Sequence, residues 1–381
     1  MKKIVIASDS FKGCASSLEV AEAAAAAVRR VFPDCEVVKI PVADGGEGTM
    51  EALLYSLNGR MVSCTVHDPL MNPIRAEYGI SDDSKTAIIE MAAASGLPLV
   101  PEDKRNPLQT TTYGTGELIK DALARGCHQF LIGIGGSATN DAGTGMLQAL
   151  GFRFLNSAGQ ELGRGGKILT DIHTIDDTNA IPQLRESVFT IACDVNNPFS
   201  GKDGAAYVYA RQKGASDATI HLLDEGLASF AAVVEKEKHI DLNTIAGAGA
   251  AGGLGGGFLA FLAATLKPGI RMVLDAIRFE EQIRGADLII TGEGKLDVQT
   301  AMGKTPWGVL QVARGQNIPV IAIGGSVENT EALNNQGFLS VFSIQPGVVT
   351  LEQAMEKKFA LANIERTVIQ FLRIVRRTRD V

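Results

Sequence analysis

The chain has 381 residues, more than the roughly 250–300 residues at which a single core usually stops growing, so we expect two domains. Hydrophobic residues make up 45% and charged residues 21%, which excludes an intrinsically disordered chain. The net charge of −7 is opposite in sign to the surface of nucleic-acid-binding proteins, so we expect no nucleic-acid partner. Five dispersed cysteines without a CxxC pair fit neither a disulfide framework nor a zinc site and favour a cytoplasmic location.

We expect neither an export signal nor a membrane segment. The first apolar run ends at Ala7, which is too short for a signal peptide. Residues 245–266 carry no charge but consist largely of glycine and alanine, and these residues insert poorly into bilayers. The segment is interpreted as a buried glycine-rich loop that leads into a helix.

The first part of the chain alternates strand and helix patterns. A short apolar strand at 3–7 is followed by a helix over 17–31, which Ser16 and Glu19 open as a capping box. A second strand follows at 36–42. Three strand-like runs joined by turns then occupy 61–67, 75–80 and 86–91.

The last third returns to alternating units. Strands are predicted at 287–291 and 318–323, with a helix over 305–314 between them and a final helix from about residue 351. This pattern predicts an open parallel-sheet α/β domain built from both chain ends, residues 1–60 and 285–381. Residues 61–284 are expected to form an inserted mixed α+β domain.

Six predicted strands end in loops of small residues that also carry a carboxylate, a hydroxyl or a lysine. They cover residues 5–12, 42–49, 131–141, 191–198, 289–297 and 321–326. In open parallel sheets, ligands bind beyond the carboxyl ends of the strands, where such loops expose backbone N–H groups. The loops therefore predict a phosphate site.

Phosphoryl transfer also needs cations and oxygen ligands for magnesium. Lysines beside small residues are candidates for the phosphate: Lys12, Lys213 and Lys304. Carboxylates in the loops are candidates for the metal or a base: Asp44, Glu47, Asp141, Asp194, Glu293 and Asp297. Each of these acids has the alternative of a helix cap or a turn, where Asp and Glu are also common.

Two familiar phosphate motifs are weak here. Residues 298–305 end like a P-loop, but Val298 replaces the first glycine and Pro306 follows. Residues 247–252 match GxGxxG without a convincing strand before them. The residues alone leave two alternative functions open: an NAD(P)-dependent oxidoreductase that uses the 247–252 loop, and a non-catalytic nucleotide sensor.

A dozen motifs in order resemble the bacterial glycerate kinase family. They are SDSFK (8–12), PVADGGEGT (41–49), EMAAASGL (90–97), KRNPL (104–108), GTGELI (114–119), IGIGGSATND (132–141), ACDVNNP (192–198), QKGA (212–215), GAGAAGG (247–253), KPGI (267–270), ITGEG (290–294) and GKTPWGV (303–309). The resemblance implies phosphorylation of D-glycerate with ATP and Mg²⁺. It also implies a flavodoxin-like domain with a second α/β domain inserted, and an active site in the cleft between them. The expected product is 2-phosphoglycerate, with 3-phosphoglycerate left open, and the oligomeric state is not indicated.

On this resemblance we assign expected roles. Asp194 or Asp44 would accept the proton of the glycerate hydroxyl, and Lys304 would act on the ATP phosphates. Asp9, Ser10, Lys12 and Arg105 would bind the substrate, and Glu293 and Asp297 would hold magnesium. The nucleotide would contact Gly45, Gly46, Gly135, Gly136, Ser137, Gly252, Gly253, Gly292 and Gly294. The sequence departs from the family pattern at Ser8, Gly13, Arg211, Lys295 and Val298.

Overall fold

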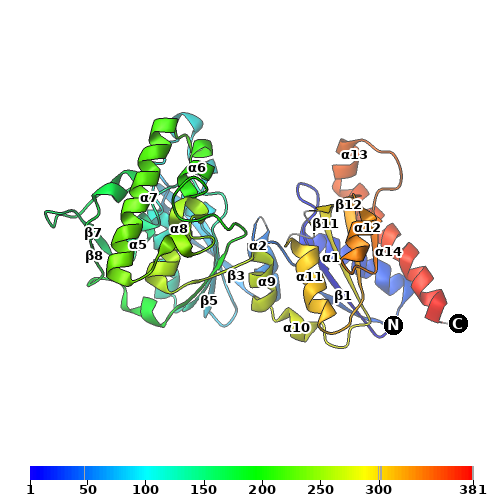
Figure 1. Cartoon of the computed structure of the whole chain (residues 1–381). Helices are drawn as coiled ribbons and strands as arrows, with labels where there is room; N and C mark the ends of the chain where they lie inside the picture. The colour runs from blue at the N-terminus through cyan, green and yellow to red at the C-terminus, as the bar shows by residue number, and fades with distance from the viewer. Residues whose placement is uncertain (47, 299, 301–302, 380–381) are drawn as a thin grey trace. The chain divides into compact units, whose positions relative to one another are not determined.

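The computed structural model describes residues 1–46, 48–298, 300 and 303–379 (Figure 1). Glu47, one of the predicted acids, lies outside the described residues. The chain divides into two compact units. The first consists of Met1–Leu57 with Pro268–Val381, and the second of Asn58–Lys267.

The first unit is built on a parallel sheet. Its strands are β1 (Lys3–Ser8), β2 (Glu36–Lys39), β11 (Leu288–Leu296), β12 (Val320–Val327) and β13 (Ser340–Ser343). They lie in the order β13-β12-β11-β1-β2, and every neighbouring pair is parallel. Numbered along the chain, the order is 2-1-3-4-5, that of flavodoxin-like sheets. The order reverses between β1 and β11, which is where such sheets bind their ligands.

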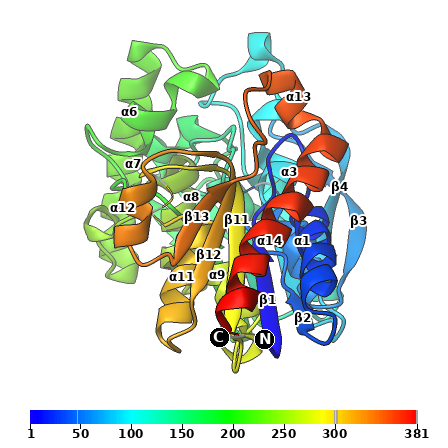
Figure 2. The same cartoon turned by 90° about the vertical axis from the view of Figure 1, so that its right-hand side faces the viewer.

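Both faces of this sheet are buried. Alternate strand residues point to opposite faces, and helices cover each face. Ile4 and Ile290 belong to one core cluster with α1 (Ser17–Val31) and α14 (Lys357–Arg379), and these two helices lie side by side (Figure 2). Val5 and Ile289 are equally buried outside that cluster, and α11 (Thr305–Arg314) packs on β11 and β12. The predicted parallel α/β sheet is confirmed.

Five further helices lie in the described part of the first unit. They are α2 (Thr49–Ser56), α9 (Gly269–Ala276), α10 (Phe279–Gln282), α12 (Thr330–Asn335) and α13 (Leu351–Met355). The sequence pattern had assigned 268–284 to the inserted domain. In the structure α9 and α10 instead group with the first unit, because both pack against α11.

The second unit contains a mixed sheet. Its strands are β3 (Arg60–His67), β4 (Pro73–Ile80), β5 (Thr86–Glu90), β6 (Gln129–Gly133), β9 (Val188–Ala192) and β10 (Thr265–Lys267). They lie in the order β10-β9-β6-β5-β4-β3. The four strands from β10 to β5 are parallel, whereas β3 and β4 form an antiparallel hairpin beside β5. A separate hairpin joins β7 (Arg153–Leu155) and β8 (Thr174–Asp176).

The helices of the second unit are α3 (Ala92–Ser95), α4 (Tyr113–Ala124), α5 (Thr144–Ala149), α6 (Ala205–Tyr209), α7 (Asp217–Lys238) and α8 (Ala250–Leu262). Six short 3-10 helices lie between them: η1 (Leu97–Leu99), η2 (Glu102–Lys104), η3 (Gly166–Asp171), η4 (Pro182–Glu186), η5 (Arg211–Lys213) and η6 (Leu242–Thr244).

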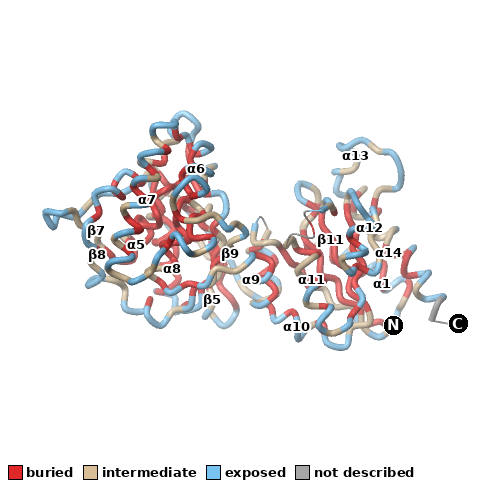
Figure 3. The backbone as a smooth tube through the Cα atoms, in the orientation of Figure 1, coloured by how far each residue is buried: buried red, intermediate tan, exposed pale blue. Residues whose placement is uncertain are grey.

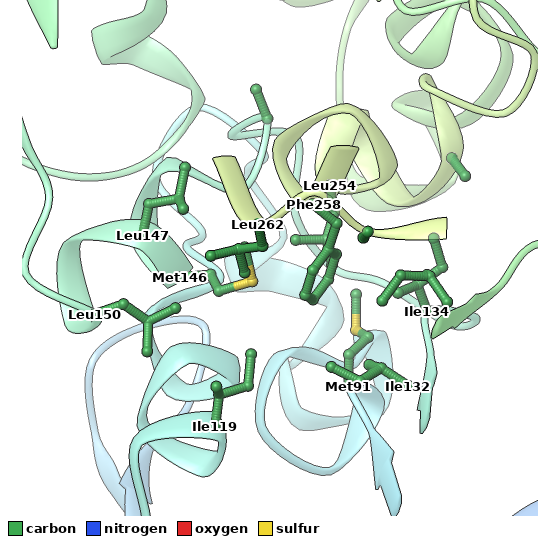
Figure 4. Close-up of a cluster of buried hydrophobic side chains, with 14 of the residues drawn as sticks. Met91, Ile119, Ile132, Ile134, Met146, Leu147, Leu150, Leu254, Phe258 and Leu262 are labelled. Carbon is green, nitrogen blue, oxygen red and sulfur yellow. The ribbon is translucent and has the colours of Figure 1, made fainter. Parts of the chain in front are cut away.

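The core of the second unit lies where α4, α5 and α8 meet the sheet. Ile119, Met146 and Phe258 belong to one buried cluster, together with side chains at the ends of β5 and β6 (Figure 4). Buried residues run through the interior of each unit, while α13 is largely exposed (Figure 3). None of the helices within the described ranges has the length and apolar character needed to cross a membrane.

Candidate active site

The switch point of the first unit brings two carboxylates together. Ser8, the last residue of β1, is the register partner of Gly292 on β11. Asp9 follows Ser8 and Glu293 follows Gly292, so the two carboxylates lie on neighbouring segments of the chain. The backbone N–H of Asp9 donates to the carbonyl of Gly292 at 2.9 Å. This is the position at which a flavodoxin-like sheet binds ligands.

Asp9 is almost completely buried, with 2% of its surface exposed. Its Oδ1 accepts from the Ser10 backbone N–H at 2.6 Å, and its Oδ2 accepts from Thr305 Oγ1 at 2.7 Å. Burial raises the pKa of Asp9 to about 6, and the nearby Asp44 carboxylate acts in the same direction. Asp9 therefore holds a proton more readily than an ordinary carboxyl group.

Glu293 is 8% exposed and is bounded by a hydroxyl and an ammonium group. Thr300 Oγ1 donates to Glu293 Oε1 at 2.6 Å, and Lys304 Nζ lies 3.8 Å from Oε2. Burial raises the pKa of Glu293 to about 7 despite both contacts. This carboxyl group therefore changes charge close to neutral pH.

Lys12 and Asp44 form the more exposed side of this cluster, with Nζ 3.4 Å from Oδ2. Gly45 has a φ of +94°, which favours glycine, and the backbone N–H of Gly46 donates to Asp44 Oδ1 at 3.2 Å. A cavity of about 260 Å³ is lined by Asp9, Ser10 and Lys12 among others. Six predicted site residues of the first unit thus meet in one place: Asp9, Ser10, Lys12, Asp44, Glu293 and Lys304.

The ITGEG segment lies within a strand rather than in a loop, because β11 continues to Leu296 alongside β12. A Cβ on Gly292 would lie 2.5 Å from the carbonyl oxygen of Ile323, so sheet packing requires glycine there. A Cβ on Gly294 would meet nothing closer than 3.7 Å. Of these two glycines, only Gly294 has open space on its side-chain face.

Asp297 lies just beyond the end of β11. Lys295 Nζ is 3.4 Å from Asp297 Oδ2 and 3.1 Å from Glu328 Oε1. The Thr300 hydroxyl accepts the backbone N–H of Asp297 at 3.0 Å. Lys295, one of the departures from the family pattern, thus forms ion pairs with two acids.

In the second unit, four parallel strands end in register. Glu90 pairs with Gly133, Gly133 with Ala192, and Ala192 with Lys267. The 135–137 loop follows β6, and the exposed Asp194 follows β9. Since β6 and β9 are neighbours, the sheet brings the loop and Asp194 to the same edge.

The 135–137 loop exposes its two glycines, whereas Ser137 is buried. Gly135 and Gly136 are exposed, and a Cβ on Gly135 would meet nothing within 4 Å. The loop is fixed by bonds to the EMAAASGL segment: the Leu97 N–H donates to the Gly136 carbonyl at 2.8 Å, and the Ala138 N–H to the Ser95 carbonyl at 3.0 Å.

Asp141 has a structural role. It is completely buried, and its Oδ2 accepts from the Thr112 N–H at 2.8 Å and from Thr112 Oγ1 at 2.9 Å. The N–H groups of Gly143 and Gly145 donate to the same carboxylate at 3.3 Å. Burial raises the pKa of Asp141. It joins the starts of α4 and α5, which is the helix-cap alternative raised by the sequence.

Gly252 and Gly253 are buried in the kinked start of α8, with φ values of +72° and +86°. A Cβ on Gly252 would lie 2.1 Å from the Thr139 carbonyl oxygen, and one on Gly253 would lie 2.9 Å from the Phe199 ring. These glycines allow the start of α8 to pack directly against the 139–142 segment.

Arg105 is partly buried beside the QKGA segment. Its Nε donates to the Val100 carbonyl at 3.4 Å. Gly214 packs against the carbonyl oxygen of Arg105, since a Cβ on Gly214 would lie 2.2 Å from that oxygen. The structure therefore places Arg105 against Gly214 of the QKGA segment.

Comparison with known proteins identifies the family. The family model described as "Glycerate kinase family" matches residues 4–376. The chain is 50% identical over 366 residues to the glycerate kinase of Bacillus subtilis, covering 96% of this chain and 95% of that one. It is 48% identical over 353 residues to the glycerate 2-kinase of Escherichia coli, with 92% and 93% covered.

A crystal structure from Salmonella typhimurium LT2, provisionally assigned as glycerate kinase 2, matches with a TM-score of 0.91 and 44% identity over 100% of both chains. This chain belongs to the glycerate kinase family. It is therefore an enzyme, a kinase whose phosphate donor is ATP, and an NAD(P)-dependent oxidoreductase is not favoured. Within this glycerate kinase family member, the 247–252 motif follows η6 and not a strand, unlike a dinucleotide-binding fingerprint.

Two hydroxyl groups of the family enzyme were missed from the sequence. Thr305 donates to Asp9 and Thr300 to Glu293. Both threonines follow the ITGEG segment and lie in or beside the GKTPWGV segment, so their position next to these motifs was the available signal. Lys213 was predicted from its place beside glycine as a candidate for the phosphate, and the structure buries it with its Nζ on Ser137 of the 135–137 loop.

The acidic cluster suits magnesium in its donor chemistry. Mg²⁺ prefers oxygen ligands and is usually held by one or two carboxylates together with phosphates and water. Among the described residues, no three His, Cys, Asp or Glu side chains are grouped so as to hold a metal ion by themselves. The raised pKa values of Asp9 and Glu293 mark carboxylates that a nearby cation would stabilise in their charged form. The residues present therefore fit a site shared between the protein and the nucleotide.

Proposed function

We propose that this kinase transfers the γ-phosphoryl group of ATP to D-glycerate and forms 2-phosphoglycerate. The observation that carries the proposal is the pair of buried carboxylates, Asp9 and Glu293, at the switch point of a flavodoxin-like sheet with Lys12 and Lys304 beside them. The 2-hydroxyl is favoured over the 3-hydroxyl by the name of the relative from Escherichia coli, a glycerate 2-kinase.

The phosphate-binding role is proposed for Lys304 and for glycines with accessible backbone. Gly135, Gly136 and Gly294 leave room for a ligand to approach, and Ser137 adds a hydroxyl group. Gly45 and the exposed Gly46 are proposed to contribute through the loop beside Asp44. Gly252, Gly253 and Gly292 are filled by neighbouring atoms, so we propose that they act by shaping the loops rather than by touching the nucleotide.

Glu293 and Asp297 are proposed to hold magnesium. When bound, the ion would neutralise charge that develops on the transferred phosphoryl group. Lys304 lies 3.8 Å from Glu293 and is proposed to move toward a phosphate oxygen when the carboxylate contacts the metal. Lys295 holds Asp297 from the solvent side.

Substrate binding and proton transfer complete the proposal. Lys12, Ser10 and Arg105 are proposed to bind the glycerate carboxylate, since cations form strong hydrogen bonds with carboxylates. Asp9 would orient the substrate hydroxyl groups. Asp194 or Asp44 would accept the proton of the attacking hydroxyl as the general base.

The test is incubation of the full chain with ATP and D-glycerate, with and without Mg²⁺, followed by mass spectrometry and phosphorus NMR of the products. We expect ADP and 2-phosphoglycerate only when magnesium is present. ATP that binds without being consumed would indicate a sensor and would contradict the proposal. Formation of 3-phosphoglycerate would contradict the assignment of the 2-hydroxyl alone.

We also propose a cytoplasmic location. All five cysteines are free thiols in the structure, and reducing compartments keep thiols in this state. Fractionation of the native cells with an activity assay would test the location.

A further inference from the structure

Lys213, in η5 of the second unit, is a buried cation. It is 2% exposed, and its Nζ donates to Ser137 Oγ and to the Thr139 carbonyl, each at 2.6 Å. Within the described part of the chain, the partners of Nζ are these two oxygens, and no carboxylate forms an ion pair with it. Buried charges are normally paired, so the position of this ammonium group calls for a reason.

The 135–137 loop has backbone donors that are not used within the chain. The backbone N–H groups of residues 135, 136 and 137 have no acceptor among the described residues. Because Ser137 Oγ accepts the bond from Lys213, its own hydroxyl hydrogen remains free to donate. Three successive amides without an acceptor, together with a hydroxyl group, are donors of the kind that binds anions.

The next two residues of the segment carry unsatisfied polar atoms. Thr139 Oγ1 and both polar atoms of the Asn140 side chain are buried without a hydrogen-bond partner. Buried polar atoms are normally hydrogen-bonded to protein, water or ligand. They are an independent sign that this segment binds more than its own chain.

We propose that Lys213 is a positioning residue for a phosphate group of the nucleotide bound on the 135–137 loop. Its ammonium group orients the Ser137 hydroxyl so that the hydrogen faces the phosphate, and it supplies positive charge behind the amides. The inference rests on the proposed function for the identity of the anion. It gives Lys213, a phosphate candidate from the sequence, an indirect role through Ser137.

The electrostatics agree with this arrangement. Burial lowers the pKa of Lys213 to about 7, with Asp141 acting in the opposite direction. A phosphate on the loop would favour the charged form of the lysine. Because charges interact more strongly in the protein interior than in water, a buried lysine can contribute to anion binding without touching the anion.

The experiment compares K213M with the control K120M, a change at an exposed lysine of the same unit. Calorimetry measures the dissociation constants of ATP and of adenosine for the full chain. We expect K213M to bind ATP roughly 10- to 100-fold more weakly, the range for losing a charge-assisted hydrogen bond. Adenosine affinity and the K120M variant should stay at the wild-type level. Equal ATP affinity in K213M and wild type would overturn the inference.

A second variant tests the route through Ser137. We expect S137A to weaken ATP binding, and S137A/K213M to bind ATP about as weakly as K213M alone, because coupled residues are not additive. Fully additive losses would overturn the positioning role. If K213M does not fold, S137A decides, and unchanged ATP affinity in S137A overturns the inference.

The anion itself is tested by kinetics. A raised KM for glycerate with an unchanged dissociation constant for ATP would assign the loop to the substrate carboxylate and overturn the phosphate assignment. Failure of the proposed function is distinguishable, because it would appear in the wild-type product assay and not in the difference between wild type and K213M in ATP affinity.

Discussion

The two units place opposite chemistry at the same kind of sheet edge. Beyond the carboxyl end of β1 and on the adjacent part of β11, the first unit gathers buried acids, with the pKa of Asp9 raised to about 6 and that of Glu293 to about 7. At the carboxyl end of β6, the second unit presents amide N–H groups with Lys213 behind them. Both edges follow the rule that parallel sheets bind ligands beyond their carboxyl ends. The rule therefore predicts the position of a site, while the groups at that position decide the sign of the charge on the ligand.

The largest effect is expected at the edge of the second unit. If Asp194 is the base, Asp194→Asn should lower kcat by roughly 10²- to 10⁴-fold with little change in the unfolding transition, since Asp194 is exposed. Steady-state assays with Asp82→Asn as a surface control would measure this. Near-normal turnover in Asp194→Asn would move the role to Asp44, at the acidic edge.

A stability test separates glycines that permit packing from glycines that leave room for a ligand. In Gly252→Ala the new Cβ would lie 2.1 Å from the Thr139 carbonyl at a φ of +72°. We expect a loss of roughly 2–4 kcal/mol in the free energy of unfolding. Gly135→Ala meets no atom within 4 Å and should change stability by less than about 0.5 kcal/mol. Urea denaturation of both variants gives the comparison, and a stable Gly252→Ala protein would contradict it.

The acidic edge predicts a pH dependence of stability. Because the pKa of Glu293 rises from 4.5 to about 7 on folding, the folded state binds more protons than the unfolded state between these values. Stability therefore falls as pH rises through this window, and the destabilisation from the ionised, buried carboxylate is fully present above pH 7. Glu293→Gln should be more stable than wild type by roughly 1–3 kcal/mol at pH 8 and equally stable near pH 4.

Urea denaturation at the two pH values measures this effect. Asp9→Asn should show the same sign with its window ending near pH 6. A Glu293→Gln variant less stable than wild type at pH 8 would mean that the contacts with Thr300 and Lys304 outweigh burial.

The smallest effects are expected for the cations proposed to bind the glycerate carboxylate, Lys12 in the first unit and Arg105 in the second. Lys12 is half exposed and paired with Asp44, and such pairs contribute little to stability. Lys12→Met should therefore unfold within about 0.5 kcal/mol of wild type while raising the KM for glycerate roughly tenfold. Arg105→Met in the second unit is the matched variant. An unchanged KM in both would place the carboxylate anchor elsewhere.

Several features followed from the sequence alone. The family, the ATP-dependent kinase class and the parallel α/β sheet were correctly predicted, because they rest on hydrophobic patterning and on motifs that are local in the chain. The loops after β1, β2, β6 and β9 were predicted for the same reason, since strand and loop propensities depend mostly on near neighbours. The loops predicted at 289–297 and 321–326 were wrong, because β11 and β12 continue through almost all of these residues and pair with each other.

Only the tertiary structure distinguished residues that look alike in sequence. Gly135 and Gly252 stand in similar glycine-rich motifs, yet one is exposed and the other is packed against Thr139. Asp141 and Asp9 both follow strands, but helix starts enclose the first and the Thr305 hydroxyl meets the second. Lys213 lies 76 positions from Ser137 and contacts it directly. Burial, and with it the charge state of Asp9, Glu293 and Lys213, depends on such distant contacts, and local sequence pattern does not contain them.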